Sequence, residues 1–220
     1  MAPGRENRNT TAKDTEVMAR YTGPKNRLSR KFGEDLGLKT NALKTAKRLY
    51  TPPGQHGAKG SRRKVSQYGI QLKEKQKLKA VYGVLEKKLV ALYQEASRAS
   101  TNTGTTLLSY LERRLDNVIY QAGFAPTRAA ARQLVNHGHF LVGDKKVNVP
   151  SYRVQVGDVV IVRPKSAKKS LLAEAIKNNT KTDLGWLKVK AGAVTMLRLP
   201  EREEIKENIE EQLIVEFYSK

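Results

Sequence analysis

The stretch RLDNVIYQAGFAPTRAAARQLVNHGHFLVGDKKVNVPSYRVQVGDVVIV, residues 114–162, decides the fold because it joins helical patterns to a compact β pattern. Residues 140–142 and 145–149 carry aromatic or β-branched side chains on either side of Gly143-Asp144, which is typical of a hairpin. Residues 159–162 come after a second Gly-Asp pair and predict a strand that returns to the hairpin. The stretch therefore predicts an α+β module in which two short helices pack on a small antiparallel sheet.

The first helical pattern lies just before and within this stretch. Six apolar residues between residues 107 and 122 recur at helical spacing, and Gly123 ends the pattern. One helix is predicted here, with its apolar stripe toward the core. Three polar residues are expected outside that stripe: Arg113, Arg114 and Asn117.

The second helical pattern starts at Thr127, whose hydroxyl suits the N-cap of a helix. Apolar residues between 130 and 135 are expected to face inward, whereas Arg128, Arg132 and Asn136 recur four apart on another face. Two guanidinium groups one turn apart can bind adjacent phosphates. We therefore interpret this stretch as an RNA-binding module.

The charge of the chain also indicates a polyanionic partner. Its 220 residues include 42 Lys and Arg against 21 Asp and Glu, which gives a formal net charge of +21. Such an excess favours nucleic acid. Membranes also attract basic proteins, but no apolar run approaches the roughly 20 residues that span a bilayer. We expect an RNA partner, no membrane association and a cytoplasmic location.

The chain contains no cysteine and three histidines, His56, His137 and His139. Disulfides and thiolate metal sites are therefore excluded, and a site built from imidazole alone is not expected. We predict no metal and no cofactor. His137 and His139 are interpreted as groups that form hydrogen bonds or contact phosphate.

The whole chain divides into four segments of different composition. Residues 1–17 are polar and have no signal-peptide core, so they are expected to be a disordered basic extension. Residues 18–106 are expected to form a mainly helical domain, completed by residues 184–220. Residues 107–183 are assigned to the inserted module.

Within the helical domain, residues 21–68 lack apolar periodicity and predict a largely irregular, extended segment. Residues 71–99 predict one long helix with an apolar stripe, from which Lys73 and Lys77 point away. Trp186 is interpreted as a packing residue.

The last twenty residues reverse the charge of the chain, with seven acidic residues against three basic ones. Pro200 suits the first turn of a helix, and apolar residues at positions 205, 209, 213 and 217 form a stripe. A helix packed on the first domain is predicted. Its acidic face is expected to be free to contact a protein through Glu204, Glu207 and Glu211.

Several short motifs match one known family in the same order. They include Met18-Ala19-Arg20-Tyr21, Gly23-Pro24-Lys25, Pro53-Gly54-Gln55-His56-Gly57, Tyr82-Gly83-Val84-Leu85-Glu86 and the ending Leu213-Ile214-Val215-Glu216-Phe217-Tyr218-Ser219-Lys220. Over most of its length the chain resembles the bacterial small-subunit ribosomal protein S-four (S4) family, and the module resembles the S4 RNA-binding domain. Some members hold a zinc ion with four cysteines, so this chain resembles the cysteine-free form.

This resemblance implies a structural protein of the small ribosomal subunit that clamps a junction of 16S rRNA helices in the 5′ domain and nucleates assembly. It implies a place beside the mRNA entrance, where mRNA would be contacted by Lys59, Arg62, Arg63 and Lys64. It further implies contact with protein S-five (S5), with S-three (S3) as another neighbour. The S5 contact would affect decoding accuracy.

Basic and polar side chains of both domains are expected to bind the rRNA. The residues assigned to this role are Arg20, Tyr21, Lys25, Arg27, Arg30, Lys31, Gln55, His56, Lys73, Lys77, Arg113, Arg114, Asn117, Thr127, Arg128, Arg132, Asn136 and His137.

Two other functions would use the same module. Some pseudouridine synthases and tyrosyl-tRNA synthetases carry it as a targeting domain, but the residues before 107 show no nucleotide-binding glycine pattern, metal spacing or Ser/His/Asp arrangement. A chaperone for stalled ribosomal RNA is the third possibility. The motif matches outside the module favour the structural protein over both.

Overall fold

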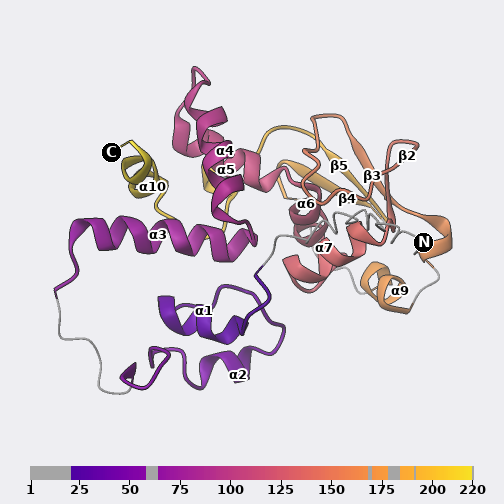
Figure 1. Cartoon of the computed structure of the whole chain (residues 1–220). Helices are drawn as coiled ribbons and strands as arrows, with labels where there is room; N and C mark the ends of the chain where they lie inside the picture. Colours follow the sequence, from indigo (N-terminus) through magenta and orange to yellow (C-terminus); the bar gives the residue numbers. More distant parts are fainter. Residues whose placement is uncertain (1–20, 58–63, 168–169, 178–183, 191, 220) are drawn as a thin grey trace, which may run out of the picture.

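The computed structural model describes residues 21–57, 64–167, 170–177, 184–190 and 192–219. These residues form a helical unit and a module built on one sheet, which lie side by side in Figure 1. The predicted α+β class is confirmed. None of the described helices is long and apolar enough to cross a bilayer.

The helical unit combines helices from the N-terminal half of the chain with the C-terminal helix. It contains α1 (Lys25–Phe32), α2 (Ala42–Ala46), α3 (Gln67–Tyr82), α4 (Glu86–Ser97), α5 (Thr103–Glu112) and the C-terminal α10 (Glu211–Tyr218). α10 packs against α3 and α5 (Figure 1). Buried apolar side chains from these helices other than α2, and from the connections, form one core: Phe32, Leu36, Leu78, Val81, Tyr82, Val84, Leu89, Leu92, Ala96, Leu107, Leu108, Leu111, Ile205, Ile209 and Ile214.

The single helix predicted over residues 71–99 is wrong, because the structure divides it at Gly83. Gly83 has φ 61°, a left-handed conformation that ends α3, and its N–H donates to the Lys79 carbonyl. α4 begins three residues later at Glu86. The resulting turn lets α3 and α4 bury different faces in the same core.

The single helix predicted over residues 107–122 is also wrong. α5 ends at Glu112, and Arg114 takes an extended conformation and forms an isolated antiparallel bridge with Arg153. The next helix, α6 (Leu115–Gln121), belongs to the module. The apolar side chains of α5 pack in the helical unit, so the border between the two cores lies at this break.

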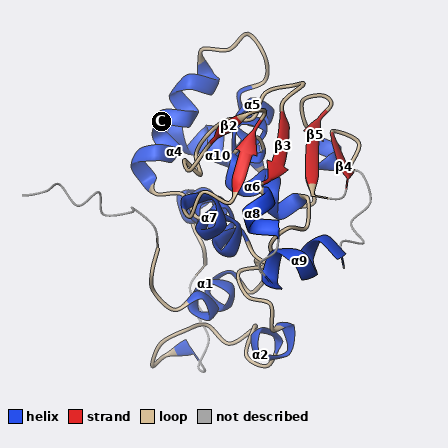
Figure 2. Cartoon of the chain, turned by 90° about the vertical axis from the view of Figure 1, so that its right-hand side faces the viewer, coloured by secondary structure: helices blue, strands red, loops and turns tan. Residues whose placement is uncertain are grey.

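The module contains α6, α7 (Arg128–Asn136), β1 (Phe140–Val142), β2 (Lys145–Lys146), β3 (Val159–Val162), α8 (Pro164–Ala167), α9 (Ser170–Lys177), β4 (Leu187–Lys190) and β5 (Ala193–Met196). The strands form an antiparallel sheet in the order β2-β1-β3-β5-β4, with β2 and β4 at the edges (Figure 2). The predicted hairpin and returning strand are therefore confirmed.

The sheet extends beyond the predicted limit of the module. β5 pairs with β3, with Val194 opposite Val160, and β4 pairs with β5. Trp186 is buried in the module core, as its predicted packing role requires. The segment from residue 184 to residue 196, which the sequence had assigned to the helical domain, thus completes the sheet, and only the chain after it returns to the helical unit.

Two other segments differ from their predicted conformation. Most described residues between 21 and 68 lie outside regular elements, as predicted, but the short helices α1 and α2, which the sequence did not predict, form within this range. The C-terminal helix starts at Glu211 rather than near Pro200; a 3-10 turn, η2 (Arg202–Glu204), comes first. Between η2 and α10 the chain is irregular, and the Arg202 guanidinium donates to the Ile205 and Ile209 carbonyls at 3.3 and 2.8 Å. These two bonds replace those that a helix would have provided.

Candidate nucleic-acid interface

α7 begins with the cap that the sequence predicts. The Thr127 hydroxyl accepts a hydrogen bond from the Ala130 N–H at 3.2 Å, and Thr127 itself is extended. This satisfies one of the free N–H groups of the first turn. Arg128 follows directly, so its position is set by the start of the helix.

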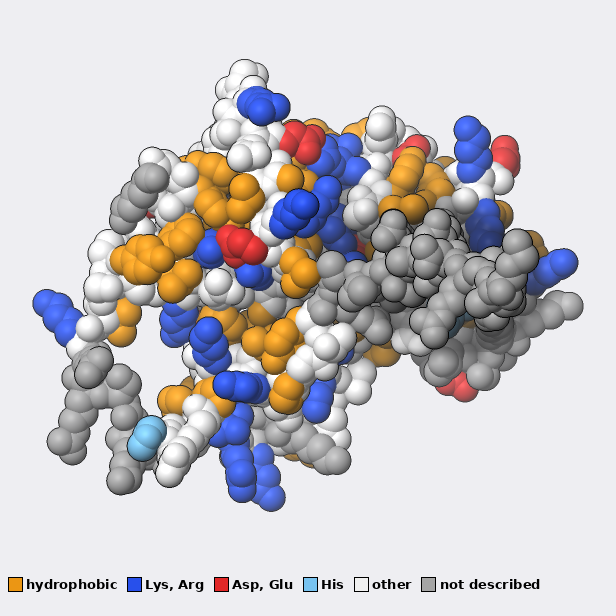
Figure 3. All heavy atoms as spheres, in the orientation of Figure 1, with side chains coloured by type: hydrophobic (Ala, Val, Ile, Leu, Met, Phe, Trp, Pro, Cys, Tyr) orange, Lys and Arg blue, Asp and Glu red, His pale blue; other side chains and the backbone are white. Residues whose placement is uncertain are grey.

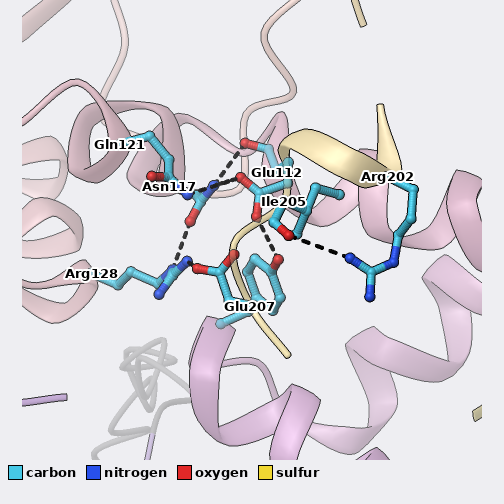
Figure 4. Close-up of polar contacts among 8 residues, drawn as sticks. Glu112, Asn117, Gln121, Arg128, Arg202, Ile205 and Glu207 are labelled. Carbon is cyan, nitrogen blue, oxygen red and sulfur yellow. Dashed lines mark hydrogen bonds and ion pairs between the residues drawn. The ribbon is translucent and has the colours of Figure 1, made fainter. Parts of the chain in front are cut away.

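Arg128 lies in an enclosed site between the two units (Figure 4). Its Nε donates to Asn117 Oδ1 at 2.7 Å, and its Nη2 is paired with the Glu207 carboxylate. The guanidinium lies 4.5 Å from the Tyr120 ring centroid and 5.0 Å from that of Tyr82. Only 11% of the side chain is exposed. The groups around Arg128 thus come from α3, α6 and the C-terminal segment.

Glu112 is the centre of the polar network behind Arg128 (Figure 4). Its carboxylate accepts hydrogen bonds from the Tyr82 hydroxyl at 2.5 Å, from Asn117 Nδ2 at 2.6 Å and from Gln121 Nε2 at 3.3 Å. Burial raises the pKa of Glu112. The expectation that Asn117 lies outside the core is wrong, since it is buried between Glu112 and Arg128.

A second buried acid, Asp116, binds two of the predicted arginines. Arg114 donates to both Asp116 oxygens, at 3.0 and 2.6 Å, and is buried, so its expected place outside the core is wrong. Arg132 Nη1 lies 3.8 Å from Asp116 and remains partly exposed. Arg113 is half-buried and donates to the Val154 carbonyl at 3.0 Å.

The predicted residues of the helical unit fall into two groups. Arg27, Lys31 and Lys73 are exposed. Lys77 is buried and pairs with Glu34 at 2.7 Å, so its expected place away from the core is wrong. Arg30 donates to the carbonyls of residues 51 and 52 at 2.9 and 3.1 Å, which ties α1 to the following loop.

The structure brings five of the predicted residues to one cavity between α1, α3 and α7. The cavity has a volume of about 90 Å³ and an apolar floor that includes Leu28 and Val81. The predicted residues that line it are Tyr21, Lys25, Thr127, Arg128 and Arg132. Basic groups of both units therefore meet at the same place, although they are far apart in the sequence.

The other predicted residues lie elsewhere or are not described. Gln55, His56 and Lys64 are exposed in the segment around residues 51–66, and Asn136 and His137 lie at the end of α7. His139 is buried, and its Nδ1 lies 2.9 Å from the Ser166 hydroxyl. Figure 3 shows Lys and Arg side chains gathered over α1 and α2. Four predicted site residues lie outside the described residues: Arg20, Lys59, Arg62 and Arg63. The predicted extension over residues 1–17 lies outside them as well.

The acidic face expected on the C-terminal segment is not free. Glu204 pairs with Arg198 at 2.8 Å, Glu207 with Arg128, and Glu211 with Arg202 at 3.0 Å. All three glutamates are partly buried by these contacts. The expectation of an open acidic face is therefore wrong, because arginines of the same chain neutralise it.

Sequence reasoning missed the residues that hold the site together, above all Tyr82, Glu112 and Asp116. A buried acid gives no periodic signal of its own, and its partners lie up to 30 residues away in the chain. Among the described residues, no group of three or more His, Cys, Asp or Glu side chains could hold a metal ion.

Comparison with known proteins gives two family matches that together cover most of the chain. Residues 20–112 match the Ribosomal protein S4/S9 N-terminal domain, and residues 113–160 match the S4 domain. The chain is 50% identical over 209 residues to small ribosomal subunit protein uS4 of Chloroflexus aurantiacus, a match that covers 92% of this chain and 100% of that protein. Proteins of the same name from Parabacteroides distasonis and Brevibacillus brevis are 51% and 50% identical over 205 and 204 residues, with the same coverage. The border between the two family matches falls at the break between α5 and α6.

Proposed function

The chain belongs to the S4 family of small-subunit ribosomal proteins, and from this membership we propose that it clamps a junction of 16S rRNA helices in the 5′ domain and nucleates subunit assembly. Its relatives are ribosomal proteins over their full length, which confirms the prediction of a structural, non-enzymatic constituent of the small subunit that binds rRNA through an S4 domain. The targeting-domain and chaperone interpretations are thereby set aside.

The observation that carries this proposal is the meeting of cations from both units. Lys25 of α1, Lys79 of α3 and Arg132 of α7 line the same cavity. A duplex junction presents phosphates on more than one helix, and a rigid pair of basic surfaces selects that shape without reading base sequence. Release of counterions supplies a large share of the affinity.

Three finer roles follow from the family resemblance. Basic residues of the loop that contains Lys64 contact mRNA at its entrance to the subunit. The C-terminal segment around Glu204 and Glu211 meets protein S5, with S3 as a further neighbour, and both carboxylates are paired within the chain. Glu207 takes no part in this contact, because it lies in the enclosed site with Arg128. Loosening the S5 contact changes decoding accuracy.

Co-sedimentation tests the structural role. A ribosomal protein stays with small subunits through a high-salt wash, whereas a modifying enzyme or a rescue factor is removed. Binding to a transcript of the 16S 5′ domain tests the rRNA site directly. Loss of the protein from washed subunits, or equal binding to the 5′ domain and to a transcript of another rRNA domain, would refute the proposal.

A further inference from the structure

We propose that Glu207 occupies the place of an RNA phosphate on Arg128 in the free protein, and that rRNA binding displaces it. This inference rests on the proposed rRNA-binding function and adds an intramolecular competitor to it. The site is the enclosed guanidinium of Arg128, and its ligand class is a phosphodiester.

The guanidinium is held in place by groups other than Glu207. Its Nε is fixed by Asn117, which is itself bonded to Glu112, and the two tyrosine rings flank its plane. These contacts remain when Glu207 leaves. Nη2 then points a fixed donor toward an incoming anion, and a preorganised guanidinium is a strong phosphate ligand.

The carboxylate, in contrast, is poorly fixed. Glu207 lies in the irregular segment between η2 and α10, between the buried Ile205 and Ile209. Its Oε2 is buried, and no described residue forms a hydrogen bond with it. A buried acceptor without a partner favours release of the side chain to water. Of the atoms in this ion pair, Glu207 Oε2 is therefore the one whose hydrogen bonding is unsatisfied in the described structure.

There is room for an anion beside the pair. A cavity of about 290 Å³ opens next to Arg128 and Glu207, and Lys77 and Lys206 also line it. Glu34 lines it as well, but Lys77 neutralises that carboxylate at 2.7 Å. Asp35 is a further acid that lines the cavity, so repulsion favours a phosphate nearer to Lys206 than to Asp35.

The exchange has a definite electrostatic signature. When a phosphate replaces Glu207, Arg128 neutralises the phosphate but a carboxylate is set free beside the RNA, so no net charge is neutralised. When residue 207 is uncharged, the same contact adds one neutralised phosphate. The slope of log affinity against log salt should then steepen by about 0.7 to 0.9.

The test compares Glu207→Gln with Glu203→Gln. Both variants change the net charge of the chain equally, but Glu203 is exposed and has no ion pair in the described structure. We expect Glu207→Gln to bind the 16S 5′ domain transcript more tightly than Glu203→Gln. The ratio of the Glu207→Gln affinity to the Glu203→Gln affinity should be about threefold larger at 50 mM than at 200 mM salt, because one additional phosphate is neutralised.

A double-mutant cycle with Arg128→Gln completes the test, with circular dichroism to show that each variant is folded. The gain from Glu207→Gln should vanish when Arg128 is absent. Equal affinities and slopes for Glu207→Gln and Glu203→Gln, or a gain that persists without Arg128, would overturn the exchange. If Arg128→Gln does not fold, the nitrogen resonance of the Arg128 side chain in the wild type decides: it must shift when RNA binds. Failure of the wild type to bind the transcript would instead refute the proposed function.

Discussion

Tyr82 of α3 donates its hydroxyl hydrogen to the carboxylate of Glu112 at the end of α5, with 2.5 Å between the two oxygens. Both side chains are buried, and Glu112 also accepts from Asn117 of the module. The carboxylate therefore links the helical unit to the module at the point where the chain passes from one to the other. This joint fixes how the two basic surfaces face the RNA.

We expect Tyr82→Phe to lower the free energy of unfolding by about 1–3 kcal/mol, because it removes a donor from a buried carboxylate. Urea unfolding followed by circular dichroism measures this, with an unchanged dependence on urea concentration. Tyr50→Phe is the matched control, since 86% of Tyr50 is exposed. Equal stability of the two variants would show that the Tyr82 hydroxyl contributes nothing to the joint.

The stability of the chain in acid should depend on Glu86. Burial alone would raise the pKa of Glu86, but hydrogen bonds from Lys75, Lys79 and Tyr218 outweigh it and lower the pKa from 4.5 to about 2. A carboxylate with a lowered pKa stabilises the fold above its unfolded pKa, and this stabilisation is lost as the pH falls from 4.5 toward 2.

Glu86→Gln should therefore reduce the loss of stability over that pH range while lowering stability at neutral pH. Urea midpoints between pH 2 and pH 6 give the comparison, and Glu203→Gln serves as the exposed control. The prediction fails if wild type and Glu86→Gln lose stability in parallel.

Exposed basic residues should contribute to rRNA affinity, whereas buried basic residues should contribute to the stability of the fold. Changing Arg27, Lys31 and Lys73 together to Gln should lower the salt slope of rRNA binding by about 0.7 to 0.9 per lost phosphate contact. It should leave unfolding free energy within about 0.5 kcal/mol per site. Lys77→Gln should mainly destabilise the fold, because it leaves Glu34 without its buried partner.

The control for the exposed set is the change of Lys145, Lys188 and Lys190 to Gln on the edge strands, where they are equally exposed. Filter binding of the 5′ domain transcript at several salt concentrations measures both sets. An equal drop in slope would mean that net charge, and not the face carrying α1 and α3, determines the affinity.

Charge reversal in the C-terminal segment should affect accuracy more than rRNA binding. Lysine at positions 204 and 211 would face Arg198 and Arg202, so the segment should move and weaken the proposed S5 contact. We expect Glu204→Lys with Glu211→Lys to raise miscoding in a reporter assay at equal or higher rRNA affinity.

The matched control is Glu203→Lys with Glu210→Lys, two exposed residues of the same segment. Glu207 stays unchanged in both, because it bonds Arg128. Miscoding that rises equally in both pairs would assign the effect to charge in general, and normal accuracy with an intact S5 contact would exclude the proposed role.

The sequence predicted those features that depend on neighbouring residues or on the apolar character of a single side chain. The cap at Thr127, the hairpin around Gly143 and the burial of Trp186 all depend on near neighbours or on apolar character, and all three are found. The break at Gly83 was missed because the apolar stripe runs through it without a change of period. Only the left-handed backbone at that glycine interrupts the helix.

The site was harder to predict because its charges are neutralised over long distances in the chain. Arg128 and Glu207 are 79 residues apart, and Lys77 pairs with Glu34, which lies in the connection after α1. A helical wheel places such cations on the solvent-facing side, because it contains no information about an acidic partner from a distant part of the sequence. For the same reason the strand at 193–196 was assigned to the wrong unit, as nothing local marks its pairing with β3.

The position of α10 against α3 has a consequence for the order of folding during synthesis. The buried Ile209 and Ile214, which complete the core of the helical unit, are synthesised after every described strand of the module. The module's strands all lie before residue 197, so its sheet can form while the chain is still being made. The core of the helical unit can therefore close only after the strands of the module have been synthesised, and the basic surface that spans both units is complete only when α10 has packed on α3.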